Sequence, residues 1–209
     1  NYEFSGLDWK EGACQTGKRQ TPIHIHETET TPAPDSEAYG VLGDLPDGTL
    51  EYEHNKLQVE YDRGVFNLKN HMGETKFKSL QFHFHGPADH HIDHYNYDIE
   101  FHVVFQNVED PTRFLATGIF FHRDPLATER NEFLDSLNLD EVAEGFNKRD
   151  VKLSGLYDRF IGKRIYNYDG SLSVPPCTEN VEWIVFSEPI RVPESQILPF
   201  LKMWSYNKE

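Results

Sequence analysis

Apolar and polar residues alternate with the period of β-strands through the middle of the chain. Such runs occupy residues 57–61, 80–85 and 98–105, where apolar side chains recur at about every second position. Residues 114–121 are more continuously apolar, as in a strand that is buried on both faces. The pattern predicts a large, mostly antiparallel sheet.

Helical spacing is rarer than strand spacing. It occurs at residues 124–137, where Pro125 suits a first helical turn, and at residues 193–204, with a further short turn or helix at 140–146. We therefore expect a mainly β (α+β) protein whose short helices lie on the surface of the sheet. No internal repeat or low-complexity segment divides the chain, so we expect a single domain over residues 1–209.

Charge narrows the range of partners. The chain has 35 Asp and Glu residues against 20 Lys and Arg residues, a formal net charge of −15. The phosphates of nucleic acids and anionic membrane surfaces repel such a chain, so we expect neither as a partner. No apolar run is long enough for a transmembrane helix, so no membrane insertion is expected.

The two cysteines, Cys14 and Cys177, are separated by most of the chain. Two interpretations are open from composition alone. The cysteines are either two unrelated buried thiols, or a disulfide that closes a very long loop and indicates an oxidising compartment.

The histidines point to chemistry, because six of the eleven lie between residues 83 and 102. Side chains alternate across a strand, so Gln81, His83 and His85 share one face of their run, and Glu100 and His102 share one face of the next. If the two runs lie side by side, three imidazoles converge and leave one tetrahedral position open on Zn²⁺, as in catalytic zinc sites. Gln81 and Glu100 are placed to accept the remaining ring N–H groups of the ligands.

Two other interpretations of this pattern remain. The histidines could belong to a half-exposed strand that binds nothing, or to a cupin-like protein that binds Fe or Mn. Cupin-like proteins normally carry a further histidine motif downstream, and the only later histidine, His122, has no such setting. His90, His91 and His94 fall outside the alternating pattern, and we expect them to face solvent without a ligand role.

Taken together, residues 81–85 and 100–102 closely resemble the zinc site of the α-class carbonic anhydrases. Other landmarks follow in the order of that family: the Gln-Thr-Pro-Ile-His-Ile segment at 20–25, the buried strand ending Gly-Ile-Phe at 115–120 and Gly-Ser-Leu-Ser-Val-Pro-Pro-Cys at 170–177, with Glu-Trp at 182–183 and Ser-Glu-Pro-Ile at 187–190. The resemblance implies the α-carbonic-anhydrase fold, with zinc in a conical cleft. It also implies a Cys14–Cys177 disulfide, as in secreted members, and hence an extracellular or organelle-lumen location.

The activity implied by the resemblance is the reversible hydration of carbon dioxide to bicarbonate and a proton, with a zinc hydroxide as nucleophile. By the motif match, Ser173 stands where the family's threonine orients that hydroxide, and Asp89 stands where a glutamate accepts from the threonine. The pocket for carbon dioxide or bicarbonate is implied at Val104, Ala116, Leu172, Val174 and Trp183. Carbon dioxide and bicarbonate are the partners implied, and a protein partner or an oligomer is left open.

The chain also departs from the family pattern. Gly86 replaces the tryptophan that follows the second ligand, and Val174 replaces a threonine that helps to place bicarbonate. Asn55 falls at the position of the proton-shuttle histidine, with His54 beside it as the alternative shuttle. The family's closing segment, which supplies a backbone acceptor for the second ligand, is absent from the sequence up to Glu209. These departures favour an alternative: a carbonic-anhydrase-like zinc-binding protein with little or no activity, acting as a binding or structural subunit.

Overall fold

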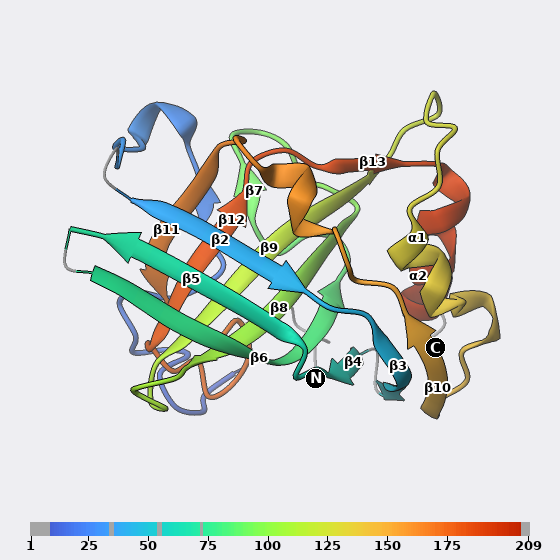
Figure 1. Cartoon of the computed structure of the whole chain (residues 1–209), viewed down its shortest axis with the longest axis horizontal. Helices are drawn as coiled ribbons and strands as arrows, with labels where there is room; N and C mark the ends of the chain where they lie inside the picture. Colours follow the sequence, from blue (N-terminus) through green and yellow to red (C-terminus); the bar gives the residue numbers. More distant parts are fainter. Residues whose placement is uncertain (1–8, 34–35, 54–55, 72, 206–209) are drawn as a thin grey trace.

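A large twisted sheet dominates the computed structural model, which describes residues 9–33, 36–53, 56–71 and 73–205 (Figure 1). Eleven strands join this sheet, with β10-β3-β4-β6-β8-β9-β12-β11 as its main path, β13 paired to β9, and β5 linking β2 to β6. The strands are β2 (Glu37–Leu42), β3 (Leu45–Glu53), β4 (Lys56–Glu60), β5 (Gly64–Asn70), β6 (Gly73–His85), β8 (Ile99–Asn107), β9 (Phe114–Arg123), β10 (Gly145–Val151), β11 (Ile165–Gly170), β12 (Val181–Phe186) and β13 (Ile190–Val192). A second, two-stranded sheet pairs β1 (His24–Ile25) with β7 (His91–Ile92).

Most neighbouring strands of the large sheet run antiparallel, as the alternating pattern predicts. The exceptions lie at β9, which pairs in parallel with β12 and with β13, so the sheet is mixed. β9 is also the continuously apolar run. It is apolar on both faces because one face packs against the helices and the other packs against aromatic side chains. The prediction of a mainly β, mostly antiparallel fold is confirmed.

The helices are short and few among the described residues: α1 (Glu132–Leu137), α2 (Glu194–Ser205) and the 3₁₀ turns at Glu27–Glu29, Leu139–Glu141 and Tyr157–Phe160. The prediction of a helix starting near Pro125 is wrong. The Asp124 side chain accepts from the Leu126 N–H and holds a turn there, and α1 begins only after Asn131, whose side chain caps it. The 193–204 prediction is confirmed by α2, which tolerates Pro199 within it.

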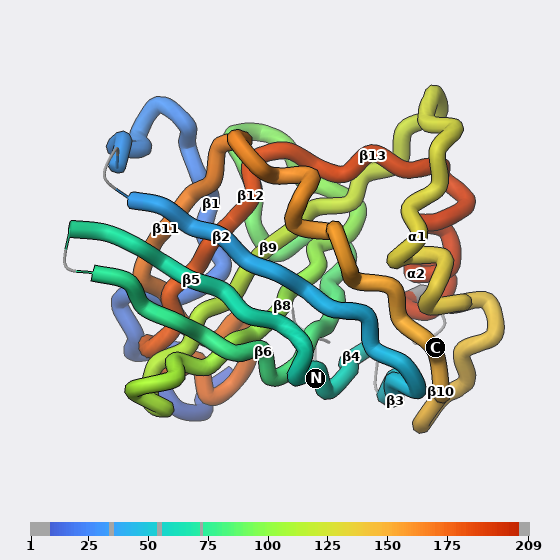
Figure 2. The backbone as a smooth tube through the Cα atoms, in the orientation of Figure 1, coloured from blue at the N-terminus to red at the C-terminus, as the bar shows by residue number. Residues whose placement is uncertain are grey.

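The two faces of the central strands differ in chemistry. One face carries aromatic side chains such as Phe82, Phe84 and Phe101, and Phe133 of α1 and Phe200 of α2 pack against them. The two helices lie side by side against this face (Figures 1 and 2), joined by paired hydrogen bonds between Asn131 and Gln196. The opposite face of β6 and β8 carries the histidines.

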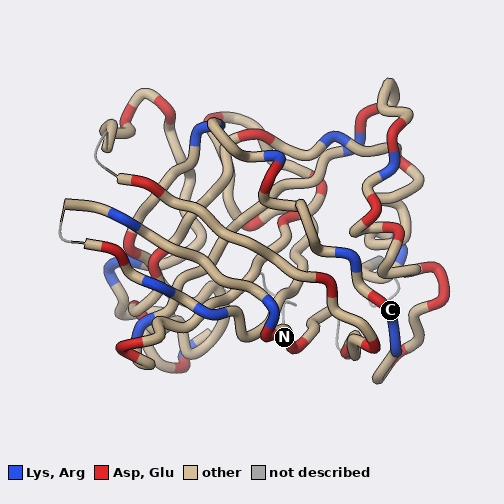
Figure 3. Tube along the Cα trace, in the orientation of Figure 1, with Lys and Arg blue, Asp and Glu red and all other residues tan. Residues whose placement is uncertain are grey.

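Long-range ties hold the surface segments. Cys14 and Cys177 form a disulfide, which indicates an oxidising compartment. Asp44 accepts from the backbone N–H groups of Leu153 and Ser154, and its pKa is lowered to about 2 by hydrogen bonds from Ser154 and by the Lys152 ammonium. Asp and Glu residues are spread along most of the described chain (Figure 3). No helix among the described residues has the length and apolar character needed to cross a membrane.

Candidate metal centre

Strand pairing brings three histidines together. In the β6–β8 register His83 lies opposite His102, and His85 lies opposite Glu100. The ring centroids are 4.9 Å apart for His83 and His85, 5.1 Å for His83 and His102, and 4.6 Å for His85 and His102. One nitrogen from each ring lies within 4.8 Å of the other two, so the three rings can bind one ion.

A hydrogen-bond acceptor faces the outward nitrogen of each ring. Gln81 Oε1 lies 2.8 Å from His83 Nδ1, and Glu100 Oε1 lies 2.8 Å from His102 Nε2. Those outward nitrogens therefore carry the protons, which leaves His83 Nε2 and His102 Nδ1 as lone-pair donors 3.3 Å apart.

The second ligand position has an acceptor that the sequence analysis assigned elsewhere. Asp89 Oδ2 lies 3.2 Å from His85 Nδ1, so this carboxylate is the acceptor for the second ring. His85 Nε2 is buried and has no hydrogen-bond partner. Such an atom is costly to leave alone, and a metal ion at the triad would supply the missing partner. The donor set of three imidazoles fits Zn²⁺.

Electrostatics keep most of the ligand set neutral. Burial lowers the pKa of His83 well below its ordinary value, and the nearby His85 and His102 rings lower it further. Burial also lowers the pKa of His102, against the opposing effect of Glu100. At His85 the Asp89 carboxylate outweighs burial and raises the pKa. Metal binding requires the neutral form, which His83 and His102 already favour.

His90 corrects the sequence prediction, because it is fully buried and does not face solvent. Its backbone N–H donates to Glu100 Oε2 at 2.8 Å, and its Nδ1 donates to Glu100 Oε1 at 2.6 Å. Its Nε2 accepts from the Tyr168 hydroxyl at 2.6 Å, and Tyr168 contacts Thr21 Oγ1 at 3.0 Å. This chain of contacts orients the carboxylate that holds His102. The sequence offered no signal for it, since Tyr168 and Thr21 are far from His90 along the chain.

Glu100 is a buried charge that depends on this arrangement. Burial alone would raise its pKa, but the His90 and His102 imidazoles outweigh burial and hold it well below its ordinary value. Gly118 provides the space, because a Cβ at this position would lie 2.5 Å from Glu100 Oε1. The β8–β9 register places Gly118 opposite His102, so any larger residue there would displace the carboxylate from its ligand.

Three of the predicted pocket residues lie in one row across neighbouring strands. Val104 of β8 is opposite Ala116 of β9, and Ala116 is opposite Trp183 of β12. The Trp183 ring lies 4.8 Å from the His102 ring. The other two, Leu172 and Val174, are half-buried in the loop between β11 and β12.

The loop that carries Ser173 is held at both ends. Trp183 Nε1 donates to Ser171 O at 2.9 Å, and Thr21 and Ser171 exchange hydrogen bonds of 2.9 and 3.1 Å. The disulfide at Cys177 fixes the far end. Both Ser173 and Asp89 are described, and no hydrogen bond joins them. The candidate proton shuttles His54 and Asn55 lie outside the described residues.

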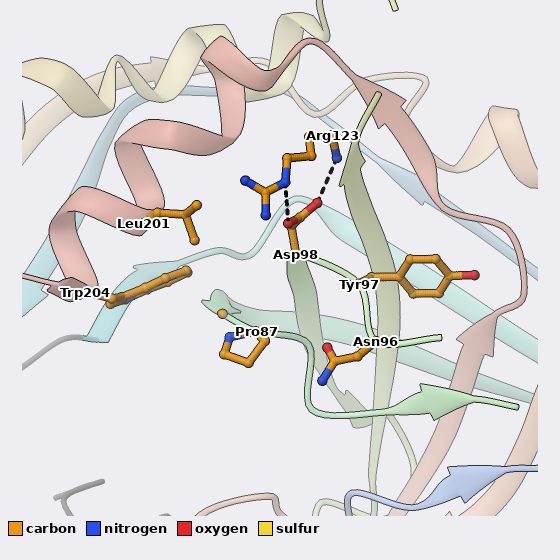
Figure 4. Close-up of a pocket in the computed structure, with 8 residues that line it drawn as sticks. Pro87, Asn96, Tyr97, Asp98, Arg123, Leu201 and Trp204 are labelled. Carbon is orange, nitrogen blue, oxygen red and sulfur yellow. Dashed lines mark hydrogen bonds and ion pairs between the residues drawn. The ribbon is translucent and has the colours of Figure 1, made fainter. Parts of the chain in front are cut away.

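Gly86 stands where the family resemblance predicts a tryptophan, and Trp204 of α2 packs against it instead. A Cβ on Gly86 would lie 2.0 Å from Trp204 Cζ3 of α2, so the indole occupies the space next to the residue that follows His85. A cavity of about 530 Å³ opens beside this contact, between Trp204, Leu201 and the Asp98–Arg123 ion pair (Figure 4). The Trp204 indole therefore fills the space beside Gly86 that the absence of a tryptophan at position 86 would leave.

The sheet, the histidine triad and its ring acceptors define a fold and a candidate metal site of the carbonic anhydrase type. The sequence profile described as eukaryotic-type carbonic anhydrase matches residues 6–209, and the chain belongs to that family. It is 29% identical over 198 residues to a carbonic anhydrase of Nostoc sp., an alignment that covers 93% of this chain and 72% of the relative.

Solved structures agree with this assignment. The structure of a fungal α-carbonic anhydrase from Aspergillus oryzae is similar with a TM-score of 0.80 and 28% identity, covering 93% of this chain and 82% of that one. Carbonic anhydrase Cah3 from Chlamydomonas reinhardtii, solved in complex with acetazolamide, has a TM-score of 0.78 and 30% identity, covering 98% and 88%. The predicted family and the α-carbonic-anhydrase fold are confirmed.

Proposed function

We propose that this chain binds Zn²⁺ through His83, His85 and His102 and catalyses the reversible hydration of carbon dioxide. One observation carries the proposal: the three imidazoles converge, and the outward nitrogen of each faces an oxygen acceptor. A protein that used these strands only as a scaffold would have no chemical need for that arrangement. The family to which the chain belongs supports the same reaction.

In this proposal the protein's residues position the reaction, and the metal, when bound, would activate the water that serves as nucleophile. A zinc ion, when bound, lowers the pKa of a water ligand toward neutrality. Gln81, Glu100 and Asp89 hold the three rings in one tautomer and orientation, which maintains the metal geometry without rearrangement during turnover.

The proposed substrate side is apolar. Val104, Ala116 and Trp183 form a wall next to His102, and Leu172 and Val174 extend it from the neighbouring loop. A nonpolar wall suits a neutral gas, which has no charge to satisfy, and it excludes competing water. The net charge of −15 does not oppose such a substrate.

Ser173 is proposed to orient the nucleophile through its hydroxyl, which can both donate and accept. Asp89 has two candidate duties, as an acceptor for Ser173 or as the holder of His85, and the 3.2 Å contact supports the second. His54 or Asn55 is proposed to pass the released proton to solvent. An oxidising location, extracellular or in an organelle lumen, is proposed from the disulfide.

A second candidate function follows from the same contact. If Asp89 is committed to His85, Ser173 lacks the acceptor that would fix its hydroxyl, and turnover would be low. The chain would then be a carbonic-anhydrase-like zinc protein that serves as a binding or structural subunit.

Zinc content and stopped-flow carbon dioxide hydration, measured with and without a sulfonamide inhibitor, separate the two functions. We expect one zinc per chain at the triad and hydration that the sulfonamide abolishes. Full zinc occupancy with hydration no faster than buffer would refute the enzyme and leave the binding protein. His102→Ala should lose both zinc and activity, whereas the exposed His71→Ala should keep both.

A further inference from the structure

Four histidines outside the triad gather at the small sheet. His24 and His26 come from β1 and the residue that follows it, and His91 and His94 come from β7 and the turn after it. The β1–β7 bridge places His24 directly opposite His91. We call His24, His26, His91 and His94 the surface histidine cluster. All four are exposed or half-exposed.

Two ring pairs of the cluster are spaced on the same scale as the triad. The centroids of His24 and His26 are 4.1 Å apart, and those of His24 and His91 are 5.7 Å apart. The triad centroids span 4.6 to 5.1 Å, between these two values. Unlike those of the triad, the ring nitrogens of the cluster do not already lie within 4.8 Å of one another, so its exposed side chains must rotate to bring them onto one ion.

The outer contacts of the cluster also follow the pattern of metal ligands. His24 Nε2 contacts the backbone carbonyl oxygen of Asp93, so it donates there and leaves Nδ1 as the lone-pair donor. Asn96 Nδ2 lies 2.8 Å from His91 Nε2 and donates to it, so metal binding through His91 Nδ1 requires the Asn96 amide to turn and present its oxygen to a proton on Nε2. Nδ1 of His24 is thus available to a ligand, and Nδ1 of His91 becomes available once that amide turns.

The surroundings of His24 favour its neutral form. The pKa of His24 is lowered first by partial desolvation and then by His26, His91 and His94, with Asp93 opposing. Neutral imidazole is the form that binds metal.

We infer that the surface histidine cluster is a second metal site, distinct from the triad, for a divalent transition metal that imidazole prefers: Cu²⁺, Ni²⁺ or Zn²⁺. His24, His26 and His91 supply the ligands, and His94 is within reach as a fourth. Because its exposed rings must rotate to close on the ion, the cluster binds more weakly than the buried triad.

Occupancy of this site would join two segments that matter to the triad. His24 follows the Thr21 segment, which contacts Tyr168, and His91 follows His90, which holds Glu100. An ion bound across β1 and β7 therefore ties the N-terminal segment to the loop that orients the ligands. Binding to the folded chain alone raises the melting temperature, and above the Kd the rise grows with the logarithm of the metal concentration.

The test uses the full chain without a polyhistidine tag, loaded with one equivalent of zinc. Equilibrium dialysis against Ni²⁺, followed by elemental analysis, should find two metals per chain. The double variant His24→Ala/His91→Ala should keep the triad zinc. It should either bind no second metal or bind it with an affinity lowered by more than about tenfold. The control His71→Ala, an exposed histidine on another turn, should still bind two.

Cu²⁺ supplies a direct view of the ligands. Electron paramagnetic resonance should show nitrogen hyperfine splitting in the wild type and lose it in the double variant. One metal per chain in the wild type, or equal nickel binding by wild type and double variant, would overturn the inference. If the double variant does not fold, the single variants His26→Ala and His91→Gln replace it. An unchanged nickel affinity in both single variants would likewise overturn the inference.

Discussion

Asp89 allows the sharpest test of how this site works. Its carboxylate lies 3.2 Å from Nδ1 of His85, and the two side chains are 21% and 10% exposed. Asp89→Ala removes the acceptor that orients this ring, and Asp89→Asn keeps an oxygen but removes the charge. If the contact supports the metal ligand, both variants weaken zinc binding, the alanine variant more.

The expected size follows from the geometry. Loss of an acceptor behind a metal-ligating histidine typically costs 10- to 100-fold in metal affinity, about 1.4 to 2.7 kcal/mol. Asp89→Asn should fall near the lower end, because the amide oxygen still accepts a hydrogen bond. Asp89→Ala should fall near the upper end, because His85 Nδ1 then lacks this partner in a largely buried position.

Zinc affinity is measured by competition with a chromophoric chelator at constant pH. Gln81→Ala, which removes the 2.8 Å contact to His83, calibrates the effect, and Asp169→Asn, an exposed carboxylate that pairs with Arg19, is the matched control. An unchanged zinc affinity in Asp89→Ala, together with a large loss of hydration rate, would refute the reasoning. That result would instead assign Asp89 to Ser173.

Three further predictions concern stability. Gly86→Ala should lower the free energy of unfolding, measured in urea, by about 1–3 kcal/mol, because the added Cβ overlaps the Trp204 ring. Adding Trp204→Ala should restore part of that free energy. An unchanged free energy of unfolding in the Gly86→Ala variant would contradict the contact. Replacing both Cys14 and Cys177 by serine should lower the free energy of unfolding by about 2–5 kcal/mol, since the bridge spans 163 residues. Reducing the wild type with dithiothreitol should lower its urea midpoint to that of the serine variant. Asp44, whose pKa is lowered to about 2, stabilises the fold above about pH 4 and loses that effect as the pH falls through 2. Asp44→Ala should therefore cost about 1 kcal/mol at pH 7, discounted for exposure, and much less at pH 2, and a pH-independent difference would contradict this.

Local periodicity accounts for much of what the sequence predicts correctly. Side chains of a strand alternate by geometry, so the spacing of Gln81, His83 and His85 fixes their shared face without knowledge of any other segment. The continuous apolar run of β9 marked a strand with both faces covered, and the family landmarks indicated the fold. What the sequence pattern determined was the chemistry that each strand carries.

Tertiary packing decided the contacts between segments. Register alone set His102 opposite His83, and a shift of one residue would have turned His102 to the other face. His90 lies in a loop, where no period assigns a direction, and its burial depends on Glu100 and on Tyr168, 78 residues away. Trp204 likewise covers Gly86 only because α2 folds back over the end of β6. Periodicity assigns faces within one element, whereas contacts between distant elements depend on how all of them pack at once.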